Sequence, residues 1–267
     1  MHRRPAKLRA ATRRAVLGNL YLWPLCQRPS QGDALVSAGF SFISALRQLS
    51  TLPRLGYDCL SAGPLGRYIW LSSRIPGWTR GHEALALARA CHTLPEHAVV
   101  VEIGSFLGSS AVLLAGARKL RGSGRVYCVD PFDASGDAPS APIYEKYQAR
   151  LGTPLREACE NNLRNAGLLD WVQILQGRAS TIAQSWTRPI DLLFMDGDHS
   201  YSEVKQTYSI WAPHLKVNGL LAVHNSTSQG NPQHDGSRRL VAELVRGPRY
   251  TDVKLVDTTT FAVKANS

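Results

Sequence analysis

One stretch, residues 98–111, constrains the fold more than any other part of the chain. An apolar run that starts at Ala98 ends at the acid Glu102, and a short loop with Gly104 and Gly108 then leads into helix-forming sequence. A strand, a glycine turn and a helix start in this order are typical of the place where an α/β sheet binds a nucleotide-like cofactor. The full G-x-G-x-x-G spacing of dinucleotide sites is missing, which argues against NAD or FAD.

Runs of strand type and helix type alternate after residue 98. Strands are predicted over residues 98–103, 125–130, 171–176, 191–196 and 220–225. Helices are predicted over residues 109–120, 154–166, 179–186, 201–215 and 236–246, the fourth with a capping box of Ser200 and Glu203. This alternation predicts a mostly parallel sheet with helices on both faces. Two more strands near 252–256 and 259–264 lie close enough in the sequence to form a hairpin.

Four other segments have a less regular pattern. Apolar spacing predicts a helix over 33–52 and another over 82–93. The Gly- and Pro-rich segment 53–81 is expected to be a connection, and 131–152 is expected to be a mobile loop.

Positive charge is concentrated at the start of the chain. Residues 1–57 hold nine of the 31 Lys and Arg residues but only one of the 20 acidic residues, which gives +8 of the net charge of +11. Residues 1–30 form a basic arm with interleaved apolar residues, which either contacts an anionic membrane surface or another acidic partner, or is a loosely docked, solvated tail. A dense basic and aromatic pattern is missing, so nucleic acid is not an expected partner.

The cysteines and the apolar runs indicate a compartment. The five cysteines are scattered and odd in number, without metal-type pairs, which indicates a reducing environment and no disulfide framework. No apolar run approaches the ~20 residues of a membrane span. A cytoplasmic location is expected, with peripheral contact at the inner membrane left open.

Polar side chains gather at the ends of the predicted strands, where ligands bind in such sheets. Asp130 ends the second strand, and an acid there can accept hydrogen bonds from both ribose hydroxyls. Asp196, Asp198 and His199 follow a buried strand, and the next strand along the chain ends in the pair 224–225, His-Asn. Carboxylate oxygens suit Mg²⁺, and a neighbouring His or Asp could take a proton from a substrate hydroxyl.

A structural interpretation of each of these residues also remains open. Asp198 could cap the following helix, His199 could make a structural hydrogen bond, and Gly104 and Gly108 could form an ordinary tight turn.

The ordered set of these motifs resembles class I S-adenosylmethionine-dependent methyltransferases, most closely the bacterial methyltransferase domain 24 type. The resemblance rests on Glu102–Gly108, Asp130, Phe194–Tyr201 and Trp211–Asn225, and it extends over roughly residues 75–264. It implies a Rossmann-like methyltransferase sheet with a C-terminal antiparallel hairpin. The expected domains are a basic, partly helical extension over 1–74 and a methyltransferase domain over 75–267.

The resemblance also implies which residues bind S-adenosylmethionine. The methionine part would lie against the first loop, the ribose against Asp130, and the adenine against the loop after the third strand. The implied set is Glu102, Gly104, Ser105, Gly108, Ser109, Asp130, Gly177, Arg178, Ala179 and Asp196.

The same resemblance suggests a catalytic base and a metal. Asp198 and His199 are the candidate bases, and Asp196, His224 and Asn225 are the candidate ligands of Mg²⁺ or another divalent cation. Metal-dependent relatives carry Asp-Asp or Asp-Asn where this chain has His224 and Asn225. Because His is a softer ligand, the need for a metal is left open.

The expected activity is O-methylation of a hydroxyl on a sugar, glycan or natural-product small molecule. The alternative is a metal-independent N- or O-methyltransferase of another small molecule. The sequence names neither the acceptor nor the oligomeric state, and a homo-oligomer is one option.

Overall fold

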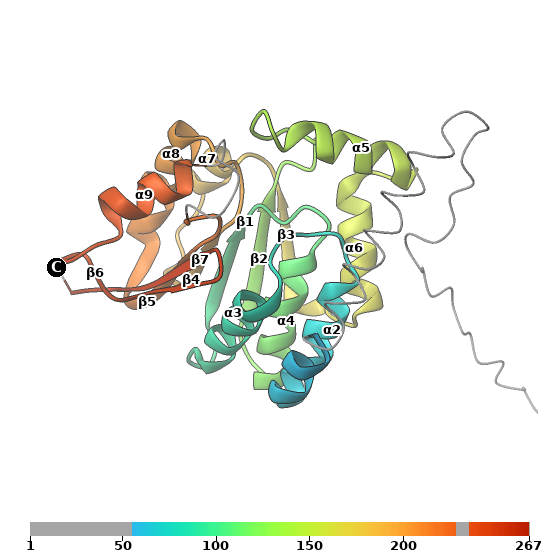
Figure 1. Ribbon diagram of the computed structural model, residues 1–267, viewed down its shortest axis with the longest axis horizontal. Coiled ribbons are helices and arrows are strands. Elements are labelled where there is room, and N and C mark those ends of the chain that lie inside the picture. Colours follow the sequence, from blue (N-terminus) through green and yellow to red (C-terminus); the bar gives the residue numbers. More distant parts are fainter. Residues whose placement is uncertain (1–54, 228–234, 267) are drawn as a thin grey trace, which may run out of the picture. The chain divides into compact units, whose positions relative to one another are not determined.

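Seven strands form one sheet in the order β3-β2-β1-β4-β5-β7-β6 (Figure 1). The computed structural model describes residues 55–227 and 235–266. The strands are β1 (Val99–Ile103), β2 (Arg125–Asp130), β3 (Val172–Gln176), β4 (Ile190–Met195), β5 (Leu215–Val223), β6 (Tyr250–Val256) and β7 (Thr259–Lys264). Strands β1 to β5 run parallel, and β7 runs antiparallel to both β5 and β6. The predicted mostly parallel sheet with an antiparallel C-terminal hairpin is confirmed.

Helices cover both faces of this sheet (Figure 1). They are α2 (Gly66–Ser73), α3 (Gly81–Thr93), α4 (Ser109–Arg121), α5 (Ala141–Leu151), α6 (Leu155–Asn165), α7 (Ala179–Ala183), α8 (Tyr201–Trp211) and α9 (Gly236–Leu244). One core lies between the sheet and helices α2, α3, α4 and α6, and the other lies between the sheet and helices α8 and α9.

The alternation of side chains along the central strands explains these two cores. Val100 of β1 packs with the α4 side, whereas its neighbour Val101 packs with the α8 side. Phe194 and Met195 of β4 divide in the same way. Successive side chains of a strand point to opposite faces, so an apolar strand covered on both sides must be apolar at nearly every position. This is why the central strands were visible in the sequence.

A buried arginine ties α4 to the segment that leads into β1. The side chain of Arg118 is fully buried and donates to the backbone carbonyl oxygens of Cys91, Pro95 and Ser123 at 2.8–2.9 Å. A buried guanidinium without partners would be costly, so these carbonyl groups keep the arginine and the loop in place together.

Two segments that we expected to lack regular structure are helical. The predicted connection 53–81 contains α2, whose Tyr68 packs so closely on α4 that a Cβ at Gly116 would come within 2.2 Å of its ring. The predicted mobile loop 131–152 contains α5, which has Pro142 in its first turn and ends at Gly152 in a left-handed conformation. These predictions were wrong because Gly and Pro here mark helix boundaries rather than loops.

Other expectations need smaller corrections. The helix predicted over 201–215 ends at Trp211, because residues 212–214 form a 3₁₀ turn and β5 starts at Leu215. The side chain of Ser200 makes no cap hydrogen bond, so the predicted capping box with Glu203 is absent there. The helix predicted over 33–52 and the basic arm of residues 1–30 lie outside the described residues, and the boundary at residue 74 stays a prediction. Among the described residues, no helix combines the length and apolar character needed to cross a bilayer.

Candidate active site

The loop after β1 is shaped by a glycine that no other residue could replace without movement. Gly104 has a φ of 88°, and a Cβ at this position would come within 2.3 Å of the backbone oxygen of Asp196. The loop therefore passes directly over the end of β4, and its residue Ser105 borders the cavity described below.

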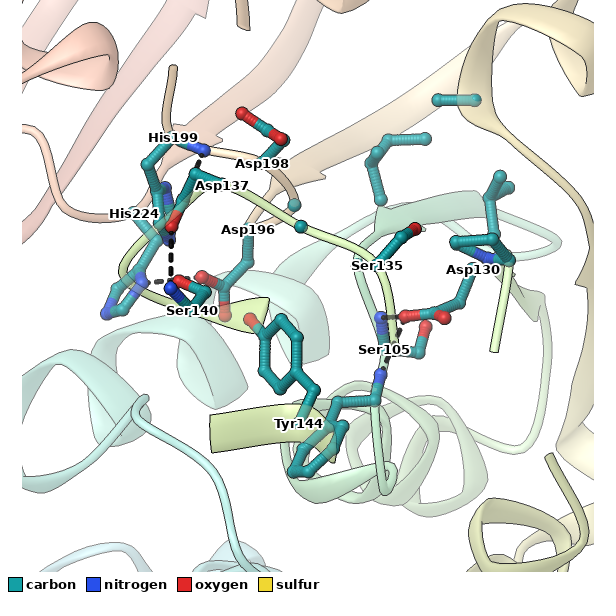
Figure 2. Close-up of a pocket in the computed structure, with 18 of the residues that line it drawn as sticks. Ser105, Asp130, Ser135, Asp137, Ser140, Tyr144, Asp196, Asp198, His199 and His224 are labelled. Atoms are coloured by element: carbon teal, nitrogen blue, oxygen red, sulfur yellow. Dashed lines mark hydrogen bonds and ion pairs between the residues drawn. The ribbon is translucent and has the colours of Figure 1, made fainter. Parts of the chain in front are cut away.

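Asp130, at the end of β2, holds this loop in place. Its carboxylate accepts the backbone N–H groups of Ser105 and Phe106 at 2.8 Å and that of Phe132 at 2.7 Å (Figure 2). A carboxylate has about four lone-pair positions, so capacity remains for ribose hydroxyls. The role of Asp130 in shaping the loop was not foreseen from the sequence.

Glu102 lies beneath the same loop and is fully buried. Its Oε2 accepts a hydrogen bond from the hydroxyl of Ser105 at 2.5 Å, and its Oε1 has no hydrogen-bond partner among the described residues. Burial raises the pKa of Glu102 to about 7, although the hydrogen bond from Ser105 opposes this shift. Glu102 therefore supports the loop from below rather than facing the cavity.

A cavity of about 610 Å³ opens at the carboxyl ends of the parallel strands. Most of the residues predicted from the sequence line it: Gly104, Ser105, Ser109, Asp130, Arg178, Ala179, Asp196, Asp198, His199, His224 and Asn225. Three of them, Glu102, Gly108 and Gly177, lie outside its lining. The structure thus brings the first loop, the second strand end and the 196–199 segment together around one cavity.

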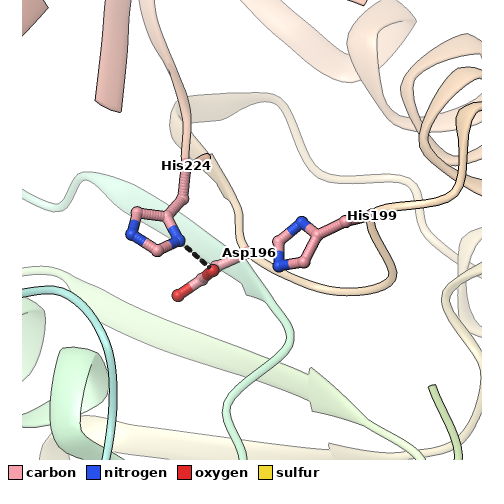
Figure 3. A group of neighbouring side chains, drawn as sticks. All are labelled: Asp196, His199 and His224. Atoms are coloured by element: carbon pink, nitrogen blue, oxygen red, sulfur yellow. Dashed lines mark hydrogen bonds and ion pairs between the residues drawn. The ribbon is translucent and has the colours of Figure 1, made fainter. Parts of the chain in front are cut away.

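Asp196 is bonded to a buried histidine. Its Oδ1 lies 2.6 Å from Nδ1 of His224, and Nε2 of His224 lies 3.5 Å from Oε1 of Glu83 (Figure 3). Both His224 and Glu83 are buried. Burial lowers the pKa of His224, but the two carboxylates outweigh burial and raise it to about 10. Desolvation raises the pKa of Glu83 as well. The hydrogen bond and charge of His224, together with the hydrogen bonds from Thr258 and Arg80, outweigh it and lower this pKa to about 2.

His199 is held from two sides near this pair. Its backbone N–H donates to Asp137 at 2.9 Å, and its Nε2 lies 3.1 Å from the amide nitrogen of Asn225. Asp198 accepts the backbone N–H of Ser200 at 2.7 Å, and Figure 2 shows its carboxylate turned away from that of Asp196. The hydrogen bond weighed for His199 is therefore present, whereas Asp198 bonds to Ser200, the residue before α8, and does not cap an N–H group of the helix.

Solved structures of known proteins share this fold at low identity. A candidate O-methyltransferase from Klebsiella pneumoniae matches with a TM-score of 0.54 and 20% identity, over 76% of this chain and 90% of its own. The O-methyltransferase TomG from Streptomyces achromogenes, solved with S-adenosylmethionine, gives 0.51 and 18%, over 71% and 82%. A Bacillus cereus O-methyltransferase, solved with the product S-adenosylhomocysteine, gives 0.52 and 17%, over 76% and 91%.

The family model of a methyltransferase domain matches residues 101–226, which run from β1 past the end of β5. The chain is a class I S-adenosylmethionine-dependent methyltransferase. In this methyltransferase, Gly104 and Asp130, which the sequence predicted at the cofactor site, border the same cavity at the carboxyl end of the sheet.

The cavity of the methyltransferase fits this cofactor. Its volume lies within the range of about 300–1,000 Å³ that small-molecule sites occupy. The loop that carries Gly104 and Ser105 lines the cavity, and Gly104 fixes it by packing on the backbone of residue 196. The carboxylates of Asp130 and Asp196 also border the cavity and suit a ligand that carries a sulfonium charge.

A divalent cation fits the methyltransferase less well. Ligand atoms of Asp196, His199 and His224 lie within 4.8 Å of one another, and the amide nitrogen of Asn225, which we also predicted as a ligand, lies 3.1 Å from Nε2 of His199. This set has one carboxylate and two imidazoles, and Mg²⁺ prefers oxygen ligands. Since both ring nitrogens of His224 already face carboxylates, no step of the reaction is assigned to a metal here.

An aromatic group that the sequence did not reveal borders the cavity. Tyr144 of α5 packs on Phe106 and Trp78, with ring centroids 5.0 and 5.7 Å apart, and all three residues line the cavity. Figure 2 shows Tyr144 between the Asp196 side and the Asp130 side of the site. The spacing of Tyr144 and Tyr147 after Pro142 is the signal that could have placed α5 here.

Proposed function

We propose that this methyltransferase transfers the methyl group to a hydroxyl of a sugar, glycan or natural-product small molecule. One observation carries the proposal: a single cavity joins the cofactor loop at Gly104 with the Asp196 and His199 side chains. An acceptor in this cavity would lie next to both a hydrogen-bond acceptor and a proton acceptor. The O-methyltransferases among the similar structures favour oxygen as the target atom.

His199 is the better candidate for the base. It is buried with a ring nitrogen within 4.8 Å of an oxygen of Asp196, whereas the carboxylate of Asp198 is turned away from that of Asp196 (Figure 2). When bound, S-adenosylmethionine supplies a methyl group that is already activated on its sulfonium sulfur. Transfer forms an O–CH₃ bond and breaks the S–CH₃ bond, and the acceptor hydroxyl loses one proton, which His199 takes. Asp196 would hold that hydroxyl in line with the methyl group.

Labelled cofactor tests the proposal. The full chain is incubated with [methyl-¹³C]-S-adenosylmethionine and a panel of hydroxylated sugars, phenols and amines, and the products are analysed by NMR. We expect the label in O–CH₃ groups, a rate that falls at least tenfold in His199→Ala, and a smaller effect of Asp198→Asn. Label in N–CH₃ groups would favour the alternative N-methyltransferase, and failure of the protein to bind S-adenosylhomocysteine by calorimetry would contradict both.

A further inference from the structure

A chain of three side chains connects α3 to the centre of the cavity. Glu83 lies on α3, His224 follows β5, and Asp196 follows β4. Nδ1 of His224 lies 2.6 Å from Asp196, and Nε2 lies 3.5 Å from Glu83. Figure 3 shows His224 and His199 on opposite sides of Asp196. Of these three residues, Asp196 and His224 line the cavity and Glu83 does not. Glu83 can therefore act on the acceptor only through His224.

The carboxylate of Glu83 is held in place by residues other than His224. Its Oε2 accepts hydrogen bonds from the backbone and hydroxyl of Thr258 at 3.1 and 2.7 Å and from the hydroxyl of Thr259 at 3.0 Å. Its Oε1 accepts the backbone N–H of Arg80 at 3.2 Å. These donors come from the turn between β6 and β7 and from the start of α3. A buried carboxylate with this many partners has one orientation, and it presents Oε1 to the imidazole.

The spacing of Asp196 and His224 suits a hydrogen bond and not a shared metal ion. Ligand atoms lie about 2.0–2.2 Å from a bound Zn²⁺. Two ligands at that distance and at right angles or wider would be roughly 3 Å apart or more. The observed 2.6 Å is shorter, and it matches a short hydrogen bond between charged groups. A cation could enter only if this bond were broken.

Asp196 then has one oxygen available for the acceptor. Oδ1 is bound by His224, and Oδ2 makes a longer contact of 3.4 Å with the hydroxyl of Thr79. The backbone N–H of Asp196 is also fixed, because it donates to Ile103 at 2.8 Å. These bonds fix the orientation of the Asp196 carboxylate, which borders the cavity, so a hydroxyl in the cavity could donate to Oδ2.

We propose that Glu83 and His224 are positioning residues that orient Asp196 toward the acceptor, and that this chain of residues fills the place of a divalent cation. The methyltransferase then requires no metal. The inference rests on the proposed function, because it assigns Asp196 the task of holding the acceptor hydroxyl. A histidine between two carboxylates supplies the positive group that a metal would otherwise provide.

Metal binding and histidine NMR test this inference without a methyl acceptor. The full chain, saturated with S-adenosylhomocysteine, is titrated with MnCl₂ and followed by electron paramagnetic resonance. We expect no bound Mn²⁺. Binding of one Mn²⁺ per chain that is lost in Asp196→Asn would overturn this proposal. The proposed function would still stand in that case, because the protein would still bind S-adenosylhomocysteine.

The positioning role is read from the ring of His224. In protein labelled with ¹⁵N-histidine, we expect both ring nitrogens of His224 to carry hydrogen-bonded protons. Glu83→Gln should remove one of these two proton signals without changing the affinity for S-adenosylhomocysteine, and the exposed control Glu157→Gln should change neither. Identical His224 signals in the wild type and Glu83→Gln, or a singly protonated ring in the wild type, would overturn the role of Glu83.

Discussion

Gly104 lies against the backbone of Asp196, with room for a hydrogen atom but not for a methyl group between them. The two residues sit at the ends of adjacent strands, since Ile103 of β1 is paired with Met195 of β4. The cofactor loop and the carboxylate on the acceptor side are therefore fixed to each other through backbone atoms. A change at either strand end should be felt at the other.

Gly104→Ala tests this contact. The added Cβ would approach residues 196 and 197 to 2.3–2.7 Å, so the loop must move. We expect at least 100-fold weaker binding of S-adenosylhomocysteine by calorimetry. Gly122→Ala is the matched control, because Gly122 also has a positive φ but nothing within 4 Å of the added group. It should cost about 1 kcal/mol of stability and leave binding unchanged. Equal binding by both variants would contradict the argument.

Asp130→Asn should weaken binding of S-adenosylhomocysteine by roughly 10- to 100-fold. The substitution removes the charge that holds the N–H groups of Ser105, Phe106 and Phe132, and hydrogen bonds to charged groups contribute about 1.5–3 kcal/mol. Calorimetry measures the effect. The exposed Asp170→Asn removes the same charge elsewhere and should leave the affinity unchanged; a similar loss there would point to a general charge effect.

The sequence predicted the sheet well and the acceptor side of the site less well. Strands β1 and β4 are buried on both faces, so their apolar runs identify them within about a residue. Helix α5 was missed because none of its residues is fully buried: Tyr144, Tyr147 and Leu151 are only partly buried against the core, so the apolar spacing of the helix is weak. The contact between Glu83 and His224 was also beyond prediction, because it depends on how α3 meets the turn between β6 and β7.

Glu102→Gln should stabilise the protein in a pH-dependent manner. In the unfolded chain this carboxyl group loses its proton near its ordinary pKa of 4.5, but in the folded protein it does so near 7. The folded state therefore holds the extra proton between these values, and wild-type stability falls as the pH rises from about 4.5 to 7.

Thermal or urea unfolding at pH 5 and pH 8 measures this effect. Glutamine keeps an oxygen for the hydroxyl of Ser105 but carries no charge, so we expect a gain of about 2 kcal/mol at pH 8 and little change at pH 5. The exposed Glu157→Gln should show no such difference. A gain of equal size at both pH values would mean that ionisation of Glu102 is not its cause.

Arg118→Met should lower the free energy of unfolding by about 3 kcal/mol or more. The methionine fills part of the space, but the carbonyl oxygens of Cys91, Pro95 and Ser123 lose their buried donor. Urea denaturation measures the loss. Arg121→Met, on the exposed end of the same helix, should stay within about 0.5 kcal/mol of the wild type. If the two variants lose the same stability, the buried hydrogen bonds are not the reason.

Helix α5 has a consequence for how such a protein can diversify. It follows β2 and precedes α6 in the chain, and it borders the cavity through Ile143 and Tyr144. None of its residues is fully buried, although Tyr144, Tyr147 and Leu151 pack against the core on the α4 side. Substitution of Ile143, which lines the cavity and is exposed, should therefore change the acceptor preference at less cost to folding than substitution of Tyr144. The fold thus separates two parts of the cavity wall: the strand ends carry the predicted cofactor residues, and a peripheral helix supplies a wall that substitutions can vary.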